Sequence, residues 1–335
     1  SYPVIGSDLS KLKQVEDADI IYLHWVLNGF MSLKSIEQLA RLKKPVVLYM
    51  HDTWTITGGC HHFLDCEKYK TACQKCPLFK NAKQNDLSSK EFSKKLKLFS
   101  KYDNLYFVAP SKWLFDAAKE SALTKNKKIF HIPNILEEDV FKPIDKSVAK
   151  KLVGLEESSK TIAFGAIAIE SPYKGWKYLQ EALEILHRKN DELGNQKINV
   201  LIFGSGYNKR IANAIPFKTK FAGFLGSDYA TSLMYNAADV FVAPSLADNL
   251  PYTVLEATSC GTPVTAFEVG GIPELISHKK NGYLAKHKNA EDLAEGIRFC
   301  LESDVNGYRL PQFKPDVVFD QYQELMNGLL TQSVW

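Results

Sequence analysis

The sequence predicts an α/β protein with two domains, each built on a parallel, doubly wound sheet. Short apolar runs that read as strands alternate along the chain with longer segments of helical period, which is the pattern of a sheet with helices on both faces. The length of 335 residues allows two such domains, and 45% hydrophobic content supports a core in each.

The first half of the chain contains four expected strands and three expected helices. The strands are near 18–23, 45–50, 105–109 and 129–132. The helices are near 32–42, 88–100 and 111–122. The segment from Glu137 to Ser159 is polar and has no clear period, so we interpret it as the interdomain linker.

A second alternation follows the linker. Its strands are expected near 161–167, 198–203, 220–222, 239–243 and 263–267. Its helices are expected near 175–189, 227–237, 251–260 and 289–302, and a last helical pattern covers about 315–330. Ser227 is an N-cap residue, and the apolar residues that follow it at helical spacing are Ala230, Leu233, Met234 and Ala237.

Residues 239–274 hold the most informative motif. An apolar strand runs into a loop with Asp248, Pro251 opens an apolar helix, and Glu256 follows eight residues after Asp248. A helix that begins with proline leaves its first N–H groups free, and the macrodipole makes that end partly positive, so it can bind phosphate. Carboxylates on both sides of such an end can accept hydrogen bonds from hydroxyl groups. The combination suggests a sugar nucleotide.

The same segment resembles the signature of retaining family 4 glycosyltransferases of the GT-B fold, as found in bacterial polysaccharide assembly. The matching residues are Asp248, Glu256, Gly261-Thr262-Pro263-Val264 and Val269-Gly270-Gly271. The first acid is Asp where Glu is commoner. An ordinary αβ crossover with solvated acids is the alternative. The resemblance implies two Rossmann-like domains that face each other across a cleft.

The resemblance also implies a division of the chain. Residues 1–140 would form an N-terminal acceptor-side domain, residues 141–310 a nucleotide-sugar-binding domain, and residues 311–335 a helix that crosses back to the first domain. A GT-B enzyme usually opens with a strand, a glycine-rich loop and a helix, whereas Ser1 to Gly6 shows only a short apolar run. We therefore expect that the first domain lacks its N-terminal βα portion.

Three residues are expected at the reacting centre. Lys174 opens a helix, where an ammonium beside a positive helix end suits a diphosphate, and the resemblance implies that it stabilises the leaving group. By the same resemblance Asp248 would hold the donor sugar, and His51 a sugar hydroxyl. The alternatives are a surface lysine and a core histidine paired with Asp52.

The nucleotide would be bound by loops and by the helix that follows Pro251. Glu256 is expected on the ribose. The resemblance implies that Gly204-x-Gly206 lies near the base and ribose, unless it is only a tight turn, and that the backbone around Leu225 contacts the base. The complete expected set is Glu256, Asn249, Leu250, Gly204, Gly206, Leu225, Thr253 and Val254. The donor would be a UDP- or GDP-linked sugar.

Two further observations concern the rest of the site. Gly165 is followed by Ala166 where many relatives carry arginine, so a second cation is missing or comes from elsewhere. Asn28-Gly29 and Gly58-Gly59 give the backbone room to approach a ligand and are acceptor-side candidates.

Four of the six cysteines lie within 17 residues, namely Cys60, Cys66, Cys73 and Cys76. In a chain read without a secretory signal, close cysteines bind metal more often than they form disulfides. Four thiolates suit tetrahedral zinc, and His61 or His62 can replace one of them. We expect a structural zinc, with two disulfides or free thiols as alternatives. The resemblance implies no catalytic metal.

The formal net charge is +4, and residues 80–101 alone hold seven Lys against two acids. The apolar residues that fall roughly on one face there are Leu87, Phe92, Leu96 and Phe99. This helix either rests on an anionic membrane or, as we favour, faces the core with solvated lysines. No apolar run approaches the roughly 20 residues that span a bilayer. We expect a cytoplasmic protein, with peripheral contact at the inner membrane face left open, and no nucleic-acid partner.

The resulting prediction is a retaining glycosyltransferase of the hexosyltransferase type. It would move a sugar from a nucleoside diphosphate to a hydroxyl of a glycan or lipid-linked acceptor in polysaccharide biosynthesis. The resemblance implies front-face attack, with the leaving diphosphate taking the acceptor proton. A nucleotide-sugar 2-epimerase of the same fold and a non-catalytic glycan-binding scaffold are the alternatives, and the Asp248/Glu256 spacing with Lys174-Gly175 favours the transferase.

Overall fold

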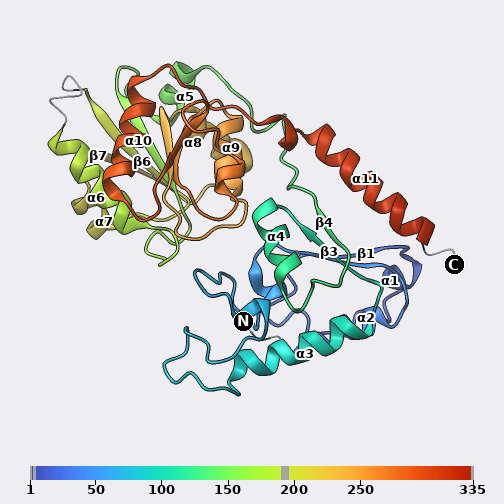
Figure 1. The fold of residues 1–335 in the computed structure, drawn as a ribbon. Coiled ribbons are helices and arrows are strands. Elements are labelled where there is room, and N and C mark those ends of the chain that lie inside the picture. Colours follow the sequence, from blue (N-terminus) through green and yellow to red (C-terminus); the bar gives the residue numbers. More distant parts are fainter. Residues whose placement is uncertain (1, 3–4, 190–195, 333–335) are drawn as a thin grey trace. The chain divides into compact units, whose positions relative to one another are not determined.

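The computed structural model describes residues 2, 5–189 and 196–332, and the chain divides into two compact units (Figure 1). Unit 1 comprises Ser1–Asn134 together with Asp316–Trp335, and unit 2 comprises Ile135–Pro315. Each unit is built on a parallel sheet. Both sheets carry buried residues on two faces, so the predicted α/β class with two parallel sheets is confirmed.

Unit 1 contains a sheet of four strands in chain order. They are β1 (Ile21–Leu23), β2 (Val46–Tyr49), β3 (Leu105–Ala109) and β4 (Ile129–His131). The helices of this unit are α1 (Lys13–Asp17), α2 (Leu33–Ala40), η1 (Thr53–Ile56), η2 (Lys68–Lys70), α3 (Leu87–Lys101), α4 (Lys112–Glu120) and α11 (Pro315–Gln332). All four expected strands are present.

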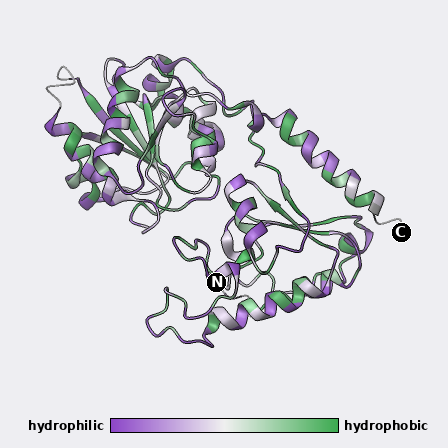
Figure 2. Ribbon diagram, in the orientation of Figure 1, coloured by the Kyte–Doolittle hydropathy of each residue, from purple (hydrophilic) through white to green (hydrophobic). Residues whose placement is uncertain are grey.

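The two central strands of unit 1 are apolar at every position because both faces of the sheet are covered. Successive side chains of a strand point to opposite faces. One face, with Val46, Leu48, Leu105 and Phe107, packs on residues of α2, α3 and α4. The other face, with Val47, Tyr49, Tyr106 and Val108, packs on Val318, Leu325 and Leu329 of α11. Figure 2 shows the result, with hydrophobic strands and helices of mixed hydropathy.

Helix α3 faces the core, as the favoured interpretation of the basic stretch expected. Phe92, Leu98 and Phe99 are buried, but Leu87 and Leu96 are 44% and 41% exposed, so the predicted apolar face was wrong in these two members. Lys95 takes their place on the buried face and is 0% exposed. None of the helices in the described part of the chain is long and apolar enough to span a membrane.

Unit 2 contains a sheet of six parallel strands in the order β10-β9-β8-β5-β6-β7. They are β5 (Lys160–Gly165), β6 (Ile198–Phe203), β7 (Lys218–Gly223), β8 (Val240–Ala243), β9 (Val264–Phe267) and β10 (Gly282–Ala285). The helices are α5 (Lys146–Val153), α6 (Trp176–Arg188), α7 (Lys209–Ala214), α8 (Asp228–Asn236), α9 (Tyr252–Ser259), α10 (Ala290–Glu302), and the short η3 (Ile272–Glu274) and η4 (Pro311–Phe313). The sequence did not predict β10 or α7, and α5 replaces part of the expected linker.

The strand order of unit 2 reverses at its centre. From β5 the chain proceeds to β6 and β7 on one side, and then returns to place β8, β9 and β10 on the other. Helix α6, which follows β5, and helix α9, which follows β8, pack on opposite faces of the sheet, and this opens a crevice beyond the carboxyl ends of the two strands. Ligands of doubly wound sheets bind in this crevice.

Candidate functional site

A pocket of about 490 Å³ lies in unit 2 beyond the carboxyl ends of β5 and β6. It is lined by Gly165, Ala166, Ile167, Ala168, Ser171, Lys174, Phe203, Gly204, Phe224, Leu225, Thr231, Tyr235, Thr253 and Glu256. These residues come from the ends of β5 and β6, from the loops after β5, β6 and β7, and from helices α8 and α9. Ligand pockets usually enclose roughly 300–1,000 Å³, so this one is large enough for a nucleotide.

Two glycines let the backbone close around the loop that follows β8. Gly175 has φ +66°, and a Cβ there would meet the carbonyl oxygen of Pro244 at 1.8 Å. Gly270 has φ +59°, and a Cβ there would meet the carbonyl oxygen of Asp248, also at 1.8 Å. Any side chain at either position would push the β8 loop away. The glycines of the predicted motifs therefore fix where Asp248 lies.

Lys174 and Asp248 lie together at this loop. The Nζ atom of Lys174 is 3.4 Å from Oδ2 of Asp248, and the two side chains are 42% and 18% exposed. The backbone N–H of Asn249 donates to Oδ1 of Asp248 at 3.0 Å, which orients the carboxylate. A pair this exposed contributes little to stability. The structure thus brings together two of the three residues that were predicted for the reacting centre.

Helix α9 begins after Pro251, and among the described residues no side chain caps its first turn. The first N–H groups of an α-helix have no partner inside the helix, and its amino end carries a partial positive charge. Thr253 and Glu256 lie on one face of α9, three residues apart, and both line the pocket. The amino end of α9 is therefore available to an anion in the pocket.

Glu256 is oriented by Tyr235 of the neighbouring helix α8. The phenol donates a hydrogen bond to Oε2 of Glu256 at 2.7 Å. Burial, reinforced by the charge of Glu256, raises the pKa of Tyr235 well above its ordinary value, so the phenol stays protonated. Burial also raises the pKa of Glu256, and the hydrogen bond from Tyr235 opposes that rise. Because this bond uses Oε2, the Oε1 atom is left to hydroxyl groups of a ligand.

Half of the predicted nucleotide-binding residues line the pocket, namely Glu256, Gly204, Leu225 and Thr253. Asn249, Leu250 and Val254 are buried and, like Gly206, are not among its described lining residues. Leu250 and Val254 belong to the apolar core beneath the β8 loop. Their side chains therefore support the loop, and contact with a ligand is left to their backbone.

Several lining residues were missed by sequence reasoning. Ser171, Thr231 and Tyr235 line the pocket, and the last two are four residues apart on one face of α8. The four-residue spacing is visible in the sequence, but the sequence prediction considered only the apolar face of the same helix. Ala166 lines the pocket at the position where many relatives have arginine, and Lys174 supplies the positive charge among the described lining residues.

His51, the third residue predicted for the reacting centre, lies in unit 1 directly after β2 and Met50. Its Nε2 atom is 3.0 Å from Nδ1 of His24, which follows β1. Burial lowers the pKa of both imidazoles, and in His51 the neighbouring His24 lowers it further. Both rings are therefore neutral at pH 7, and one can donate to the other. His24 was not predicted.

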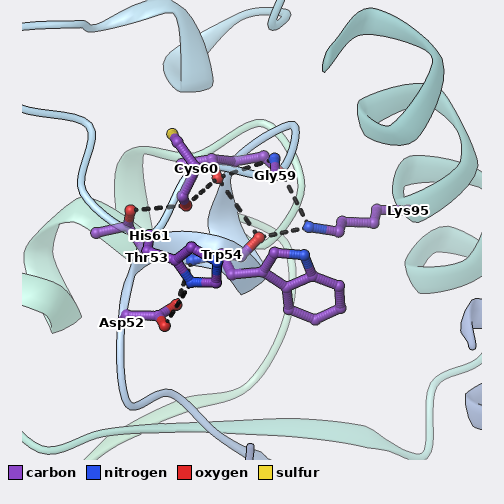
Figure 3. A network of polar contacts seen from close by, with 8 residues as sticks. Asp52, Thr53, Trp54, Gly59, Cys60, His61 and Lys95 are labelled. Carbon is purple, nitrogen blue, oxygen red and sulfur yellow. Dashed lines mark hydrogen bonds and ion pairs between the residues drawn. The ribbon is translucent and has the colours of Figure 1, made fainter. Parts of the chain in front are cut away.

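A polar network fixes the loop that follows His51 (Figure 3). Asp52 caps η1 by accepting from the N–H of Trp54 at 2.7 Å, and it pairs with Nδ1 of His61 at 2.8 Å. Lys95 of α3 donates to the carbonyl oxygens of Trp54 and Thr57, and its ammonium lies 3.6 Å from the centre of the Trp54 ring. Burial lowers the pKa of Lys95 to about 7. Asp52, which follows β2, and Lys95 of α3 thus both hold the loop.

The four clustered cysteines, which are Cys60, Cys66, Cys73 and Cys76, are free thiols and partly buried. Burial raises the pKa of Cys60 and raises that of Cys73 to about 12, so both are protonated at neutral pH. Within the described residues, no three His, Cys, Asp or Glu side chains form a group that could hold a metal ion. The structural zinc stays a prediction from spacing, which metal analysis of the purified chain tests.

The segment that carries the pocket has known relatives. Residues 159–303 match the family model Glycosyl transferases group 1. An uncharacterized glycosyltransferase of Haemophilus influenzae is 30% identical over 136 residues, which cover 39% of this chain and 37% of that protein. WcaC of Escherichia coli K12, which bears the name of a colanic acid biosynthesis glycosyl transferase, is 25% identical over 304 residues, covering 88% of this chain and 70% of WcaC. The match with the Haemophilus protein thus covers less than half the length of that protein.

Structural similarity extends over nearly the whole chain. HepE of Anabaena, solved in complex with UDP and glucose, aligns with a TM-score of 0.65 and 18% identity over 96% of this chain and 83% of HepE. The fold is GT-B. This confirms the predicted fold with its two Rossmann-like parts, and at this level of identity the likeness concerns the fold alone.

Proposed function

We propose that this chain is a retaining family 4 glycosyltransferase. It moves a sugar from a nucleoside diphosphate to a hydroxyl of a glycan or lipid-linked acceptor in polysaccharide biosynthesis. The observation that carries the proposal is the pocket of unit 2, where Lys174, the amino end of α9 and Glu256 line one volume. The family match of residues 159–303, the UDP and glucose in HepE and the name of WcaC support it.

The pocket offers a suitable group for each part of a nucleotide sugar. The diphosphate binds between Lys174 and the amino end of α9, which are both positive. The ribose hydroxyls donate to Oε1 of Glu256, whose other oxygen is held by Tyr235. The base lies toward Leu225, and Asp248, beside Lys174, holds the sugar.

The proposed reaction breaks the bond between the anomeric carbon and the diphosphate oxygen. The acceptor oxygen bonds to that carbon from the same face, and the leaving diphosphate takes its proton. Negative charge therefore grows on the diphosphate, and fixed positive groups beside it lower the barrier. Lys174 and the α9 end supply that charge, and Lys174 bears more of it because Ala166 adds none. His51 holds a sugar hydroxyl in this proposal.

Calorimetric titration of the full chain with UDP, GDP and ADP tests the donor half of the proposal. We expect one of them to bind, and Glu256→Ala to weaken that binding about tenfold because a hydrogen bond to a carboxylate is lost. The matched control is Glu184→Ala, which removes an exposed carboxylate of α6 that bonds only Gln180 among the described side chains. Absence of binding by all three nucleotides in the unaltered chain would refute the proposal.

A further inference from the structure

An exposed tryptophan lies beside the polar network of unit 1. Trp25 follows His24 after the carboxyl end of β1, and the residue is 46% exposed. Its ring and that of His61 have centres 5.2 Å apart with an angle of 32° between their planes. His61 is in turn paired with Asp52 at 2.8 Å. The indole of Trp25 is thus held at the surface by its contact with His61, which Asp52 holds in place.

The backbone holds Trp25 in an unfavourable conformation. Its φ is +25°, in a region that large side chains rarely adopt. Strain of this kind persists only where the surroundings impose it, and it is commonest at ligand-binding positions. The loop therefore keeps an indole in water although neither burial nor local preference favours that arrangement.

A narrow pocket of about 20 Å³ adjoins the indole. Trp25, Tyr49, His51, Asp52 and Thr55 line it, and the rest of its wall is apolar, with Leu23, Val26, Leu27, Leu48 and Trp54. A site that can hold one water molecule needs about 10–15 Å³, so this pocket accepts a group of the size of a hydroxyl. The carboxylate of Asp52 in its wall can accept a hydrogen bond from that hydroxyl.

We propose that Trp25 and Asp52 form a saccharide-binding subsite. The C–H groups on one face of a pyranose ring stack on the indole, because the face of an aromatic ring is negative and C–H groups beside oxygen are slightly positive. A hydroxyl of the same sugar enters the narrow pocket and donates to the carboxylate of Asp52. A macromolecular partner would need a larger continuous apolar patch than one indole.

This inference rests on the proposed function and supplies the class of its acceptor. The donor is assigned to the pocket of unit 2, and the sugar on Trp25 belongs to the molecule that receives the transferred group. Asp52 keeps room for a further donor, because a carboxylate has about four acceptor positions and the described contacts use two of them.

The test is saturation-transfer NMR and titration of the full chain with methyl glycosides. The probes are those of glucose, galactose, mannose, fucose, N-acetylglucosamine and N-acetylgalactosamine. We expect at least one to bind with a Kd near about 1 mM, Trp25→Ala to weaken it about five- to tenfold, and Trp25→Phe to keep most of it. The control Phe30→Ala, which removes another exposed aromatic ring of the same loop, leaves binding unchanged.

The subsite is refuted if no glycoside binds the unaltered chain, or if Trp25→Ala binds as the unaltered chain does. Titration of the same proteins with UDP, GDP and ADP separates this outcome from failure of the proposed function. Nucleotide binding without glycoside binding overturns only the subsite. Because Trp25 lies in unit 1, an unchanged circular dichroism spectrum and an unchanged urea unfolding curve of Trp25→Ala show that a loss of glycoside binding does not come from unfolding.

Discussion

The phenol of Tyr235 donates a hydrogen bond to Oε2 of Glu256 at 2.7 Å, from helix α8 to helix α9. Tyr235 is fully buried against Phe203 and Phe241, whereas Glu256 is half-buried and lines the pocket. The bond therefore connects the rigid core of unit 2 to the surface that meets the ligand. A hydrogen bond to a charged group contributes about 1.5–3 kcal/mol, enough to hold the carboxylate in one orientation.

Tyr235→Phe should shift the pH dependence of nucleotide binding. The bond from Tyr235 lowers the pKa of Glu256, so its loss lets burial raise that pKa further. The carboxylate is then protonated at a higher pH as the solution is acidified, and the affinity for UDP starts to fall at a higher pH than in the unaltered chain. At alkaline pH the two proteins should bind almost equally. Calorimetric Kd values across the pH range give the two profiles, and superimposable profiles would mean that Tyr235 does not act through Glu256.

Glu256 should also distinguish ribose from deoxyribose. The unaltered chain is expected to bind UDP about tenfold more tightly than 2′-deoxy-UDP, because the missing hydroxyl no longer donates to the carboxylate. Glu256→Ala should bind both nucleotides with one affinity. Competition binding with the two nucleotides measures the difference, and Glu184→Ala serves as the control. A tenfold preference that survives in Glu256→Ala would assign the ribose to another residue.

Lys174→Ala should lower turnover more than it lowers donor affinity. The charge on the departing diphosphate is larger in the transition state than in the ground state, so its loss should reduce kcat about 10²-fold while KM changes less. Release of nucleoside diphosphate from the nucleotide sugar measures both constants. Lys177→Ala, which changes an exposed lysine of helix α6 just after Lys174, should behave as the unaltered chain. An undiminished kcat in Lys174→Ala would rule out this role.

Lys95 should make unit 1 more stable as the pH rises above neutrality. Burial depresses its pKa from 10.5 to about 7, although Glu91, Cys60, Cys73 and Asp52 oppose that shift. Between those values the unfolded chain holds a proton that the folded chain does not, so the free energy of unfolding increases with pH. Urea titrations between pH about 7 and 8, below the ordinary pKa of the thiols, measure the slope.

Lys95→Met removes the titrating group and should flatten that slope. It also removes the hydrogen bonds from Lys95 to the carbonyl groups of Trp54 and Thr57, which lowers stability at every pH. Lys97→Met changes an exposed lysine of the same helix and should keep the slope of the unaltered chain. The buried-charge interpretation is wrong if Lys95→Met and the unaltered chain show parallel slopes.

The strands were readable from the sequence because a strand buried on both faces is a continuous apolar run. β10 escaped because it has only four residues and begins with Gly282, a residue type that is depleted in strands. α5 escaped because only eight residues lie between its caps. Those caps are themselves clear signals, since Asp145 accepts from the N–H of Val148 and Gly154 has φ +73°. A short helix of half-polar composition is missed when hydrophobic periodicity is given more weight than the capping residues at its ends.

The candidate site was predictable where a residue's place depends on its own strand or helix. Lys174, Asp248 and Glu256 follow such local rules. Tyr235 does not, because its role depends on how α8 packs against α9, 21 residues further along the chain. His24 likewise reaches His51 only through the register of β1 against β2, in which Leu23 lies opposite Leu48. Such pairings are properties of the assembled sheet.

Because of the terminal helix α11, the two units are completed at different times during synthesis. Unit 2 is continuous in the chain, so every residue of its sheet and helices has been made once Pro315 is added. The sheet of unit 1 is made first, yet Val47, Tyr49, Tyr106 and Val108 have no cover from Val318, Leu325 and Leu329 until the ribosome has passed through the whole of unit 2. During synthesis, unit 1 is therefore begun first and completed last. The apolar face of its sheet that α11 covers stays exposed until then.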